Sequence, residues 1–358
     1  MKTRWLALTL TAVAALGVFA ACGGDDDEGS DGNDPTATTA ATVSQPAATA
    51  TTSRPAELKD VTLGYSPILI YAPVYVALEK GYFADEGINL KLERISGGSD
   101  ILTQVAAGNF QIGASGISAA TFNAASSALK EKRDVPFEVV SPIHYEQAPN
   151  NTPLVVSKAR LDAGEIKTVA DLKGKKVAIN ALGTGTEFAL ERALQTAGLS
   201  VKDVEVVAMP FGDMGPALQN KAIDAAMLAE PQATLAKDKG LVAVLNDTYQ
   251  TGGASSTALY WNREWAKQNP ELADGFLRAY LKAAAELEDG WDDPEIVAIL
   301  TEHTKVPAEV IARASRPYFD TTGLIKTDFV KDLEAFFRSQ GHLIYEGELD
   351  LTTFIREP

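Results

Sequence analysis

The side chains of this sequence that could bind a small molecule gather where predicted strands end and predicted helices begin. They are aromatic rings, hydroxyls, one imidazole and three carboxylates: Tyr71, Ser96, Ser99, Ser115, His144, Glu146, Thr184, Thr186, Phe211, Asp213 and Glu230. No lysine or arginine occurs in the loops that carry them. Because open α/β sheets bind ligands at the carboxyl ends of their strands, we expect these side chains to share one site.

The chemistry of this set favours a neutral or proton-donating ligand with flat faces. Tyr71 and Phe211 offer rings for stacking, and the carboxylates can accept hydrogen bonds from N–H or O–H groups. Predicted helix starts near Ser99, Ser115 and Thr184 offer free backbone N–H groups, which can hold an anion. An anion would also face the three carboxylates, so an anionic ligand ranks second.

Each of these residues also has an ordinary structural interpretation. Tyr71 can pack locally, a single histidine such as His144 is often structural, and Glu230 can pair across a hinge. The Gly-Thr-Gly-Thr segment at 183–186 is not a P-loop because no lysine follows its glycines. We expect no metal site, since the chain has three histidines and they are widely spaced. No Ser-His-Asp spacing indicates catalysis.

A repeated strand–loop–helix pattern must position these side chains. The expected strands of the first block cover 61–65, 88–95, 110–114 and 136–143. Those of the second block cover 154–157, 175–180, 204–209, 225–228 and 241–245. Segment 251–258 is expected to cross back into the first sheet. This alternation predicts an α/β protein with parallel sheets.

The expected helices have recognisable starts and ends. The first begins at Pro73, presents a single apolar stripe that includes Val74, and ends at Gly81 with a left-handed cap. A capping box at 168–171 opens a short helix. The C-terminal part is predicted to be helical over 270–288, 294–304, 307–315 and 327–340. The aromatic stripe of the last helix indicates core packing rather than chemistry.

The N-terminus predicts export and lipid attachment. Lys2 and Arg4 precede an uncharged apolar run that ends in small residues before Cys22, the chain's only cysteine. The run is typical of a secretory signal and resembles the lipobox of bacterial lipoproteins. We therefore expect residues 1–21 to be a signal peptide and Cys22 to be lipidated. The acidic and Thr/Ala-rich stretch at 22–56 is expected to be a disordered tether.

Length and charge narrow the class of protein. A chain of 358 residues can fold as two domains with sizeable cores. Its net charge of −16 argues against nucleic acid as a partner, because that function needs basic patches. With one cysteine there is neither a disulfide framework nor, once that cysteine is lipidated, a thiol nucleophile.

Four blocks in order along the chain resemble the substrate-binding proteins of bacterial ABC importers. The blocks are APVYVALEKGYFADEGINL (72–90), SGGSDILTQVAAGNFQIG (96–113), DLKGKKVAINALGTGTEFAL (171–190) and NKAIDAAMLAEPQ (220–232). They are most similar to the branch whose members bind nitrate, sulfonate, taurine, thiamine-precursor pyrimidines or riboflavin. The resemblance implies the periplasmic-binding-protein type II fold, with two α/β lobes, two crossover strands and C-terminal helices.

The resemblance also implies an organisation and a role. Lobe 1 is expected to cover 57–145 and 250–358, and lobe 2 to cover 146–249. The chain would be a monomer, lipid-anchored on the extracytoplasmic face of the cell membrane, without a cofactor. It would deliver a small-molecule nutrient to an ABC permease and its ATPase.

The residues favour some ligands of this branch over others. Riboflavin or a thiamine-precursor pyrimidine suits the rings and carboxylates of the predicted loops. The alternative is a sulfonate, taurine or nitrate. A third interpretation is a surface-anchored enzyme, because yeast-type hydroxymethylpyrimidine synthases share this fold. Those enzymes carry a cysteine cluster, which this chain lacks, and we therefore expect no enzyme.

Overall fold

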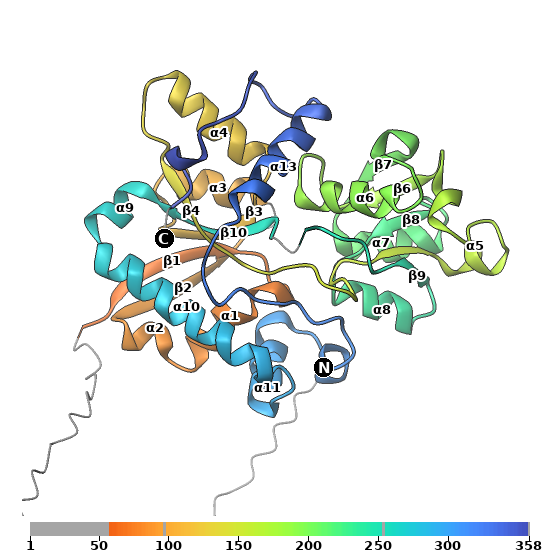
Figure 1. Cartoon of the computed structure of the whole chain (residues 1–358). Helices are drawn as coiled ribbons and strands as arrows, with labels where there is room; N and C mark the ends of the chain where they lie inside the picture. Colours follow the sequence, from red (N-terminus) through yellow and green to blue (C-terminus); the bar gives the residue numbers. More distant parts are fainter. Residues whose placement is uncertain (1–56, 96–97, 253–254, 357–358) are drawn as a thin grey trace, which may run out of the picture. The chain divides into compact units, whose positions relative to one another are not determined.

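The computed structural model describes residues 57–95, 98–252 and 255–356. The predicted signal peptide, Cys22 and the tether lie outside the described residues, as do Ser96 and the side chain of Ser99. The described chain forms two five-stranded sheets, each with its own set of helices (Figure 1). We call the first sheet with its helices the first lobe and the second sheet with its helices the second lobe.

The first sheet contains the N-terminal strands and one strand that returns from the second lobe. Its order is β2 (Ile88–Arg94), β1 (Lys59–Tyr65), β3 (Ile112–Gly116), β10 (Thr257–Asn262) and β4 (Phe137–Pro142). Strand β10 runs antiparallel to both β3 and β4, whereas β1 is parallel to β2 and β3. The return of the chain into the first sheet, expected at 251–258, is confirmed at β10.

The second sheet repeats this arrangement. Its order is β7 (Glu205–Ala208), β6 (Lys176–Ile179), β8 (Ala225–Met227), β5 (Leu154–Ser157) and β9 (Val242–Asn246). Here β5 is antiparallel to β8 and β9. The expectation of parallel sheets is therefore wrong for one strand in each. The physical reason is that the chain crosses at the carboxyl edge of one sheet and enters the other at the same edge, so the entering strand must run backwards.

Two crossing segments join the lobes: residues 143–153, and the described residues 247–252 and 255–256. Backbone and side-chain hydrogen bonds tie them together: Asn150 N–H donates to the Asp247 carbonyl at 2.7 Å, and the Tyr249 hydroxyl donates to the Thr152 carbonyl at 2.8 Å. The predicted lobe boundaries, 145/146 and 249/250, fall inside these segments and stay a prediction.

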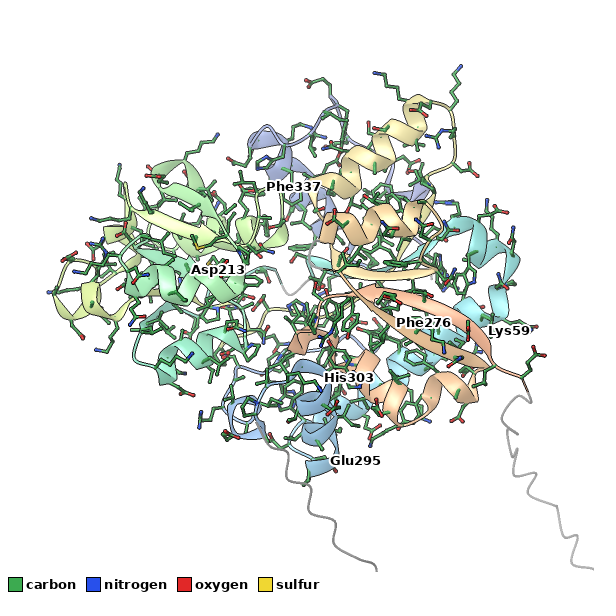
Figure 2. The ribbon with its side chains drawn as sticks, turned by 180° about the vertical axis from the view of Figure 1, so that it is seen from behind. Lys59, Asp213, Phe276, Glu295, His303 and Phe337 are labelled. Carbon is green, nitrogen blue, oxygen red and sulfur yellow. The ribbon has the colours of Figure 1, made fainter. Side chains whose placement is uncertain are left out.

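Helices cover both faces of the first sheet. One face carries α1 (Ala72–Glu79), α2 (Tyr82–Asp85) and α10 (Pro270–Gly290); the other carries α3 (Gly98–Ala106) and α4 (Ala119–Lys130) (Figure 1). Neighbouring strand residues point to opposite faces of the sheet. Leu259 packs in the core formed with α1, α2 and α10, and Tyr260 packs in the core formed with α3 and α4. Phe276 of α10, which is labelled in Figure 2, stacks on Phe83 with ring centroids 4.9 Å apart.

Helix α1 differs from its predicted single stripe. Residues 72–77 are all buried, because the helix is enclosed by α10, α11 (Pro294–Thr304) and a 3-10 turn at Leu69–Tyr71. The left-handed conformation at Gly81 is confirmed, with φ of 75°.

The C-terminal part also contains α9 (Arg263–Gln268) and α12 (Ala308–Ile311). Helix α12 is shorter than the predicted 307–315.

The second lobe packs its helices in the same two-sided way. They are α5 (Lys158–Asp162), α6 (Gly185–Gln195), α7 (Phe211–Gln219) and α8 (Gln232–Asp238), with 3-10 turns at Val169–Leu172 and Val201–Asp203. The predicted capping box at 168–171 is confirmed. Ala178 faces α7 and α8, while its neighbours Val177 and Ile179 face the core that contains α6.

Helix α13 (Thr327–Ser339) lies between the lobes, in contact with both α4 and α6 (Figure 1). Its Phe337, which is labelled in Figure 2, packs on Phe122 of α4 with ring centroids 6.1 Å apart. Its Phe329 packs edge-on against Phe188 of α6 at 5.5 Å. The predicted core stripe of this helix is confirmed. A last 3-10 turn, Leu351–Thr353, follows it.

Across residues 57–95, 98–252 and 255–356, the structure contains no helix with the length and apolar character to cross a membrane.

Candidate ligand-binding site

A cavity of about 500 Å³ lies where the carboxyl edges of the two sheets meet. Both lobes and both crossing segments contribute to its walls. Much of the lining is apolar, from Ile68, Ile70, Ile101, Phe188 and Phe329. Its volume and apolar walls are typical of sites for small molecules.

Most of the residues singled out in the sequence line this cavity. These are Tyr71, Ser115, His144, Glu146, Thr184, Thr186, Phe211 and Glu230. Asp213 is exposed in the first turn of α7 and is not among the described lining residues (Figure 2). Ser96 and the Ser99 side chain lie outside the described residues, so nothing bears on their predicted role. The ligand contacts of the whole set remain predictions.

The two aromatic candidates differ in how far they are buried. Tyr71 is 4% exposed, packs edge-on against Tyr65 at 6.3 Å and donates its hydroxyl to the Ala114 carbonyl at 2.9 Å. Burial raises the pKa of Tyr71, so its phenol stays neutral. Phe211 is the first residue of α7 and is half-buried. Phe211 therefore has more ring surface available to a ligand than Tyr71.

His144 and Glu146 lie in the first crossing segment at the cavity wall, and His144 connects that segment to β10. His144 Nδ1 and Thr257 Oγ1 share a hydrogen bond of 2.8 Å, and His144 Nε2 lies 3.7 Å from Glu146 Oε1. The other Glu146 oxygen accepts from the backbone N–H of Asn151 at 2.7 Å. Burial raises the pKa of Glu146, but His144 and the hydrogen bonds from Thr152 outweigh burial and hold that pKa below its usual 4.5.

Glu230 connects the second lobe to the C-terminal part of the chain. Its carboxylate accepts from the Thr234 N–H and hydroxyl, both at 3.0 Å, and from the Ser315 N–H at 3.3 Å. Burial raises the pKa of Glu230. The sequence left open that Glu230 pairs across the hinge. In the structure its carboxylate accepts hydrogen bonds from uncharged groups of Thr234 and Ser315.

Helices of both lobes begin at the cavity: α7 starts there at Phe211, and α4 and α6 start there as well. Ala119 and Ala120 open α4, and Gly185 and Thr186 open α6. The expected helix start at Ser115 is wrong: Ser115 still pairs with β10, so β3 continues to Gly116 and the helix begins after it.

Three cavity residues have buried oxygen atoms without a hydrogen-bond partner in the described part of the chain. They are Ser115 Oγ, Asn151 Oδ1 and Thr251 Oγ1. Sequence reasoning missed Asn151 and Thr251. The polar run Asn150-Asn151-Thr152, just before β5, was the available signal. Among the described residues that line the cavity, none is lysine or arginine.

Two α/β lobes joined by two crossing segments around a shared cavity are the arrangement of the periplasmic-binding-protein fold. The chain belongs to the NMT1/THI5-like family, which matches residues 70–289. It is 30% identical over 270 residues to the riboflavin-binding protein RibY of Chloroflexus aurantiacus, a match that covers 70% of each chain.

Solved structures share the fold. The alkanesulfonate-binding protein SsuA from Xanthomonas axonopodis pv. citri, bound to MOPS, has a TM-score of 0.67 and 17% identity, over 84% of this chain and 99% of SsuA. The periplasmic nitrate-binding protein NrtA from Synechocystis PCC 6803 has a TM-score of 0.67 and 17% identity, over 84% of this chain and 86% of NrtA. These findings confirm the fold and family expected from the four sequence blocks. The chain is an ABC-type substrate-binding protein, a class that works with a permease and its ATPase.

Proposed function

We propose that this protein captures a neutral heteroaromatic nutrient, riboflavin or a thiamine-precursor pyrimidine, and delivers it to an ABC permease. The observation that carries this proposal is the charge of the cavity. Its described lining includes Glu146 and Glu230 and neither lysine nor arginine. A neutral ring with N–H or O–H groups suits carboxylate acceptors, whereas an oxyanion would be repelled by them.

The aromatic and apolar walls support the same ligand class. Phe211 and Tyr71 lie on the cavity from opposite lobes, so a flat ligand could contact both as the lobes close. The similarity to RibY, a protein named for riboflavin binding, adds support at 30% identity.

A sulfonate, taurine or nitrate is the second candidate. The first residues of α4 and α6 both line the cavity, and helix N-termini attract anions through free N–H groups. SsuA and NrtA, which share the fold, are named for such ligands. The two cavity carboxylates weigh against this candidate.

The wider role is proposed from the sequence pattern at the N-terminus. We infer that Cys22 carries a lipid that anchors a monomer on the extracytoplasmic face of the cell membrane. The protein binds its ligand without making or breaking a bond in it. The names of the family relatives as binding proteins support this.

A thermal-shift panel tests the ligand class. The full chain is melted with riboflavin, hydroxymethylpyrimidine, its formylamino relative, taurine, an alkanesulfonate and nitrate. A ligand at a hundred times its Kd adds about 2.7 kcal/mol to the free energy of unfolding, enough to move the melting temperature by several degrees. A shift with riboflavin or a pyrimidine supports the proposal. A shift with only sulfonate, taurine or nitrate would replace it by the second candidate.

A further inference from the structure

We propose that Asn151 sets ligand specificity by accepting a hydrogen bond from an N–H group of the ligand. This inference rests on the proposed function, because it concerns the same cavity, and it narrows the ligand class. Asn151 lies in the first crossing segment and is 1% exposed at the cavity wall.

The orientation of the Asn151 amide is fixed by its neighbours. Its Nδ2 donates to the Ser315 carbonyl at 2.7 Å. Rotating the amide by 180° would set two oxygen atoms against each other, so Oδ1 must be the atom that points away from Ser315. The backbone is held as well, since the Asn151 N–H donates to Glu146 and its carbonyl accepts from the Glu230 N–H at 2.9 Å.

The amide oxygen is left without a partner. Within the residues that the structure describes, Oδ1 has no hydrogen bond, although it is shielded from bulk water. Buried polar atoms in native proteins are nearly always paired, and an unpaired one is unfavourable. Ser115 Oγ and Thr251 Oγ1, the other two such oxygens of the described cavity wall, belong to hydroxyls that can donate or accept. Asn151 Oδ1 can only accept.

The group that satisfies this oxygen must be a donor. Riboflavin carries an imide N–H on its ring, and a 4-aminopyrimidine carries an exocyclic amino group. Nitrate and a simple alkanesulfonate carry only acceptor oxygens at neutral pH and would face Oδ1 with lone pairs, whereas the ammonium group of taurine could donate to it. A site with a buried hydrogen-bonding group discriminates strongly against analogues that lack the matching atom. Asn151 therefore selects for a ligand with a hydrogen-bond donor, and among the candidate ligands it favours an N–H on a heteroaromatic edge over nitrate or a simple alkanesulfonate.

The test compares each ligand with its methylated analogue. We would titrate two pairs of compounds into the full chain and into Asn151→Leu. One pair is riboflavin and N3-methylriboflavin, and the other is a 4-aminopyrimidine and its dimethylamino analogue. Asn150→Leu is the matched control: Asn150 is fully buried, its side-chain atoms also lack partners among the described residues, and it is not a described lining residue. We expect methylation to weaken binding at least tenfold in the unchanged protein and in Asn150→Leu. In Asn151→Leu the parent and the analogue should bind within about threefold of each other, equivalent to less than about 0.7 kcal/mol.

The outcomes separate this inference from the proposed function. If a parent compound binds and its methylated analogue has the same affinity for the unchanged protein, Asn151 does not accept a hydrogen bond from the ligand. The proposed function would still stand. That comparison needs no variant, so it decides the question even if Asn151→Leu fails to fold. Equal discrimination by Asn151→Leu and the unchanged protein would likewise overturn the inference. If nitrate or an alkanesulfonate binds and neither parent does, both the proposed function and the role of Asn151 are wrong.

Discussion

Burial separates the two aromatic rings that line the cavity. Tyr71 belongs to the core of the first lobe, and its hydroxyl is committed to the Ala114 carbonyl. Phe211 stands at the start of α7 and is half-buried. Removing Tyr71 would therefore disturb folding as well as binding, whereas Phe211 can be changed with less damage to the core.

We predict that Phe211→Ala weakens ligand binding at least tenfold, about 1.4 kcal/mol, through loss of a ring face. Titration of riboflavin or hydroxymethylpyrimidine into the variant measures this. Asp213→Asn is the control, because Asp213 lies on the same helix but is exposed and not a described lining residue. Unchanged affinity in Phe211→Ala would remove Phe211 from the site.

Glu146 should give stability a specific dependence on pH. Its pKa in the folded protein lies below the usual 4.5, because His144 and the Thr152 hydrogen bonds outweigh burial. Between the folded pKa and 4.5 the unfolded state binds more protons, so this carboxylate stabilises the fold above pH 4.5 and loses that effect as pH falls.

We therefore expect Glu146→Gln to be less stable than the unchanged protein at pH 7, with a difference that shrinks as pH falls below about 4.5. Urea unfolding at several pH values measures the difference. The exposed Glu348→Gln is the control and should show no such trend. A difference that grows on acidification would contradict the assignment.

At the scale of elements, the start of α6 lies close against the second crossing segment. Gly185 is the first residue of α6, and a Cβ atom there would overlap Ser256 Oγ and Cβ. Both residues line the cavity, so this close approach helps to set the distance between the lobes.

Gly185→Ala should therefore weaken ligand binding and lower the melting temperature, because the helix or the crossing segment must move. Gly212→Ala is the matched control: Gly212 lies in the first turn of α7, and a Cβ atom added to it would have no described atom within 4 Å. That change should be neutral or slightly stabilising, since alanine favours helix. Equal melting temperatures and affinities in the two variants would show that the approach at Gly185 is not needed.

The elements illustrate what the sequence could predict. Alternation of strands and helices, Gly81 and the capping box at 168–171 are local signals, and the structure confirms them. The reversed direction of β5 and β10 depends on where the chain crosses between sheets, which no local pattern records. Asn151 was missed for a similar reason. Its unpaired oxygen becomes evident only when Ser315, far along the chain, is placed against the same amide.

At the scale of the whole molecule, the proposed lipid anchor requires the thiol of Cys22, the only cysteine of the sequence. We expect Cys22→Ala to abolish lipid attachment, so that the protein no longer partitions into detergent with membrane lipoproteins. Phase separation and metabolic labelling with a fatty acid measure this. Ala21→Gly keeps a small residue before the cysteine and should leave labelling intact. A labelled, membrane-bound Cys22→Ala protein would exclude Cys22 as the site of lipid attachment.

The ligand class is tested most directly by calorimetric titration of the full chain with riboflavin, hydroxymethylpyrimidine, nitrate and an alkanesulfonate at low and high salt. A neutral ring ligand should bind with a Kd near micromolar, about −8 kcal/mol, and its affinity should change little with salt. That result, with no heat from nitrate or sulfonate, is expected from a cavity whose described lining has carboxylates and neither lysine nor arginine. Binding of nitrate or sulfonate alone, weakening as salt rises, would contradict it.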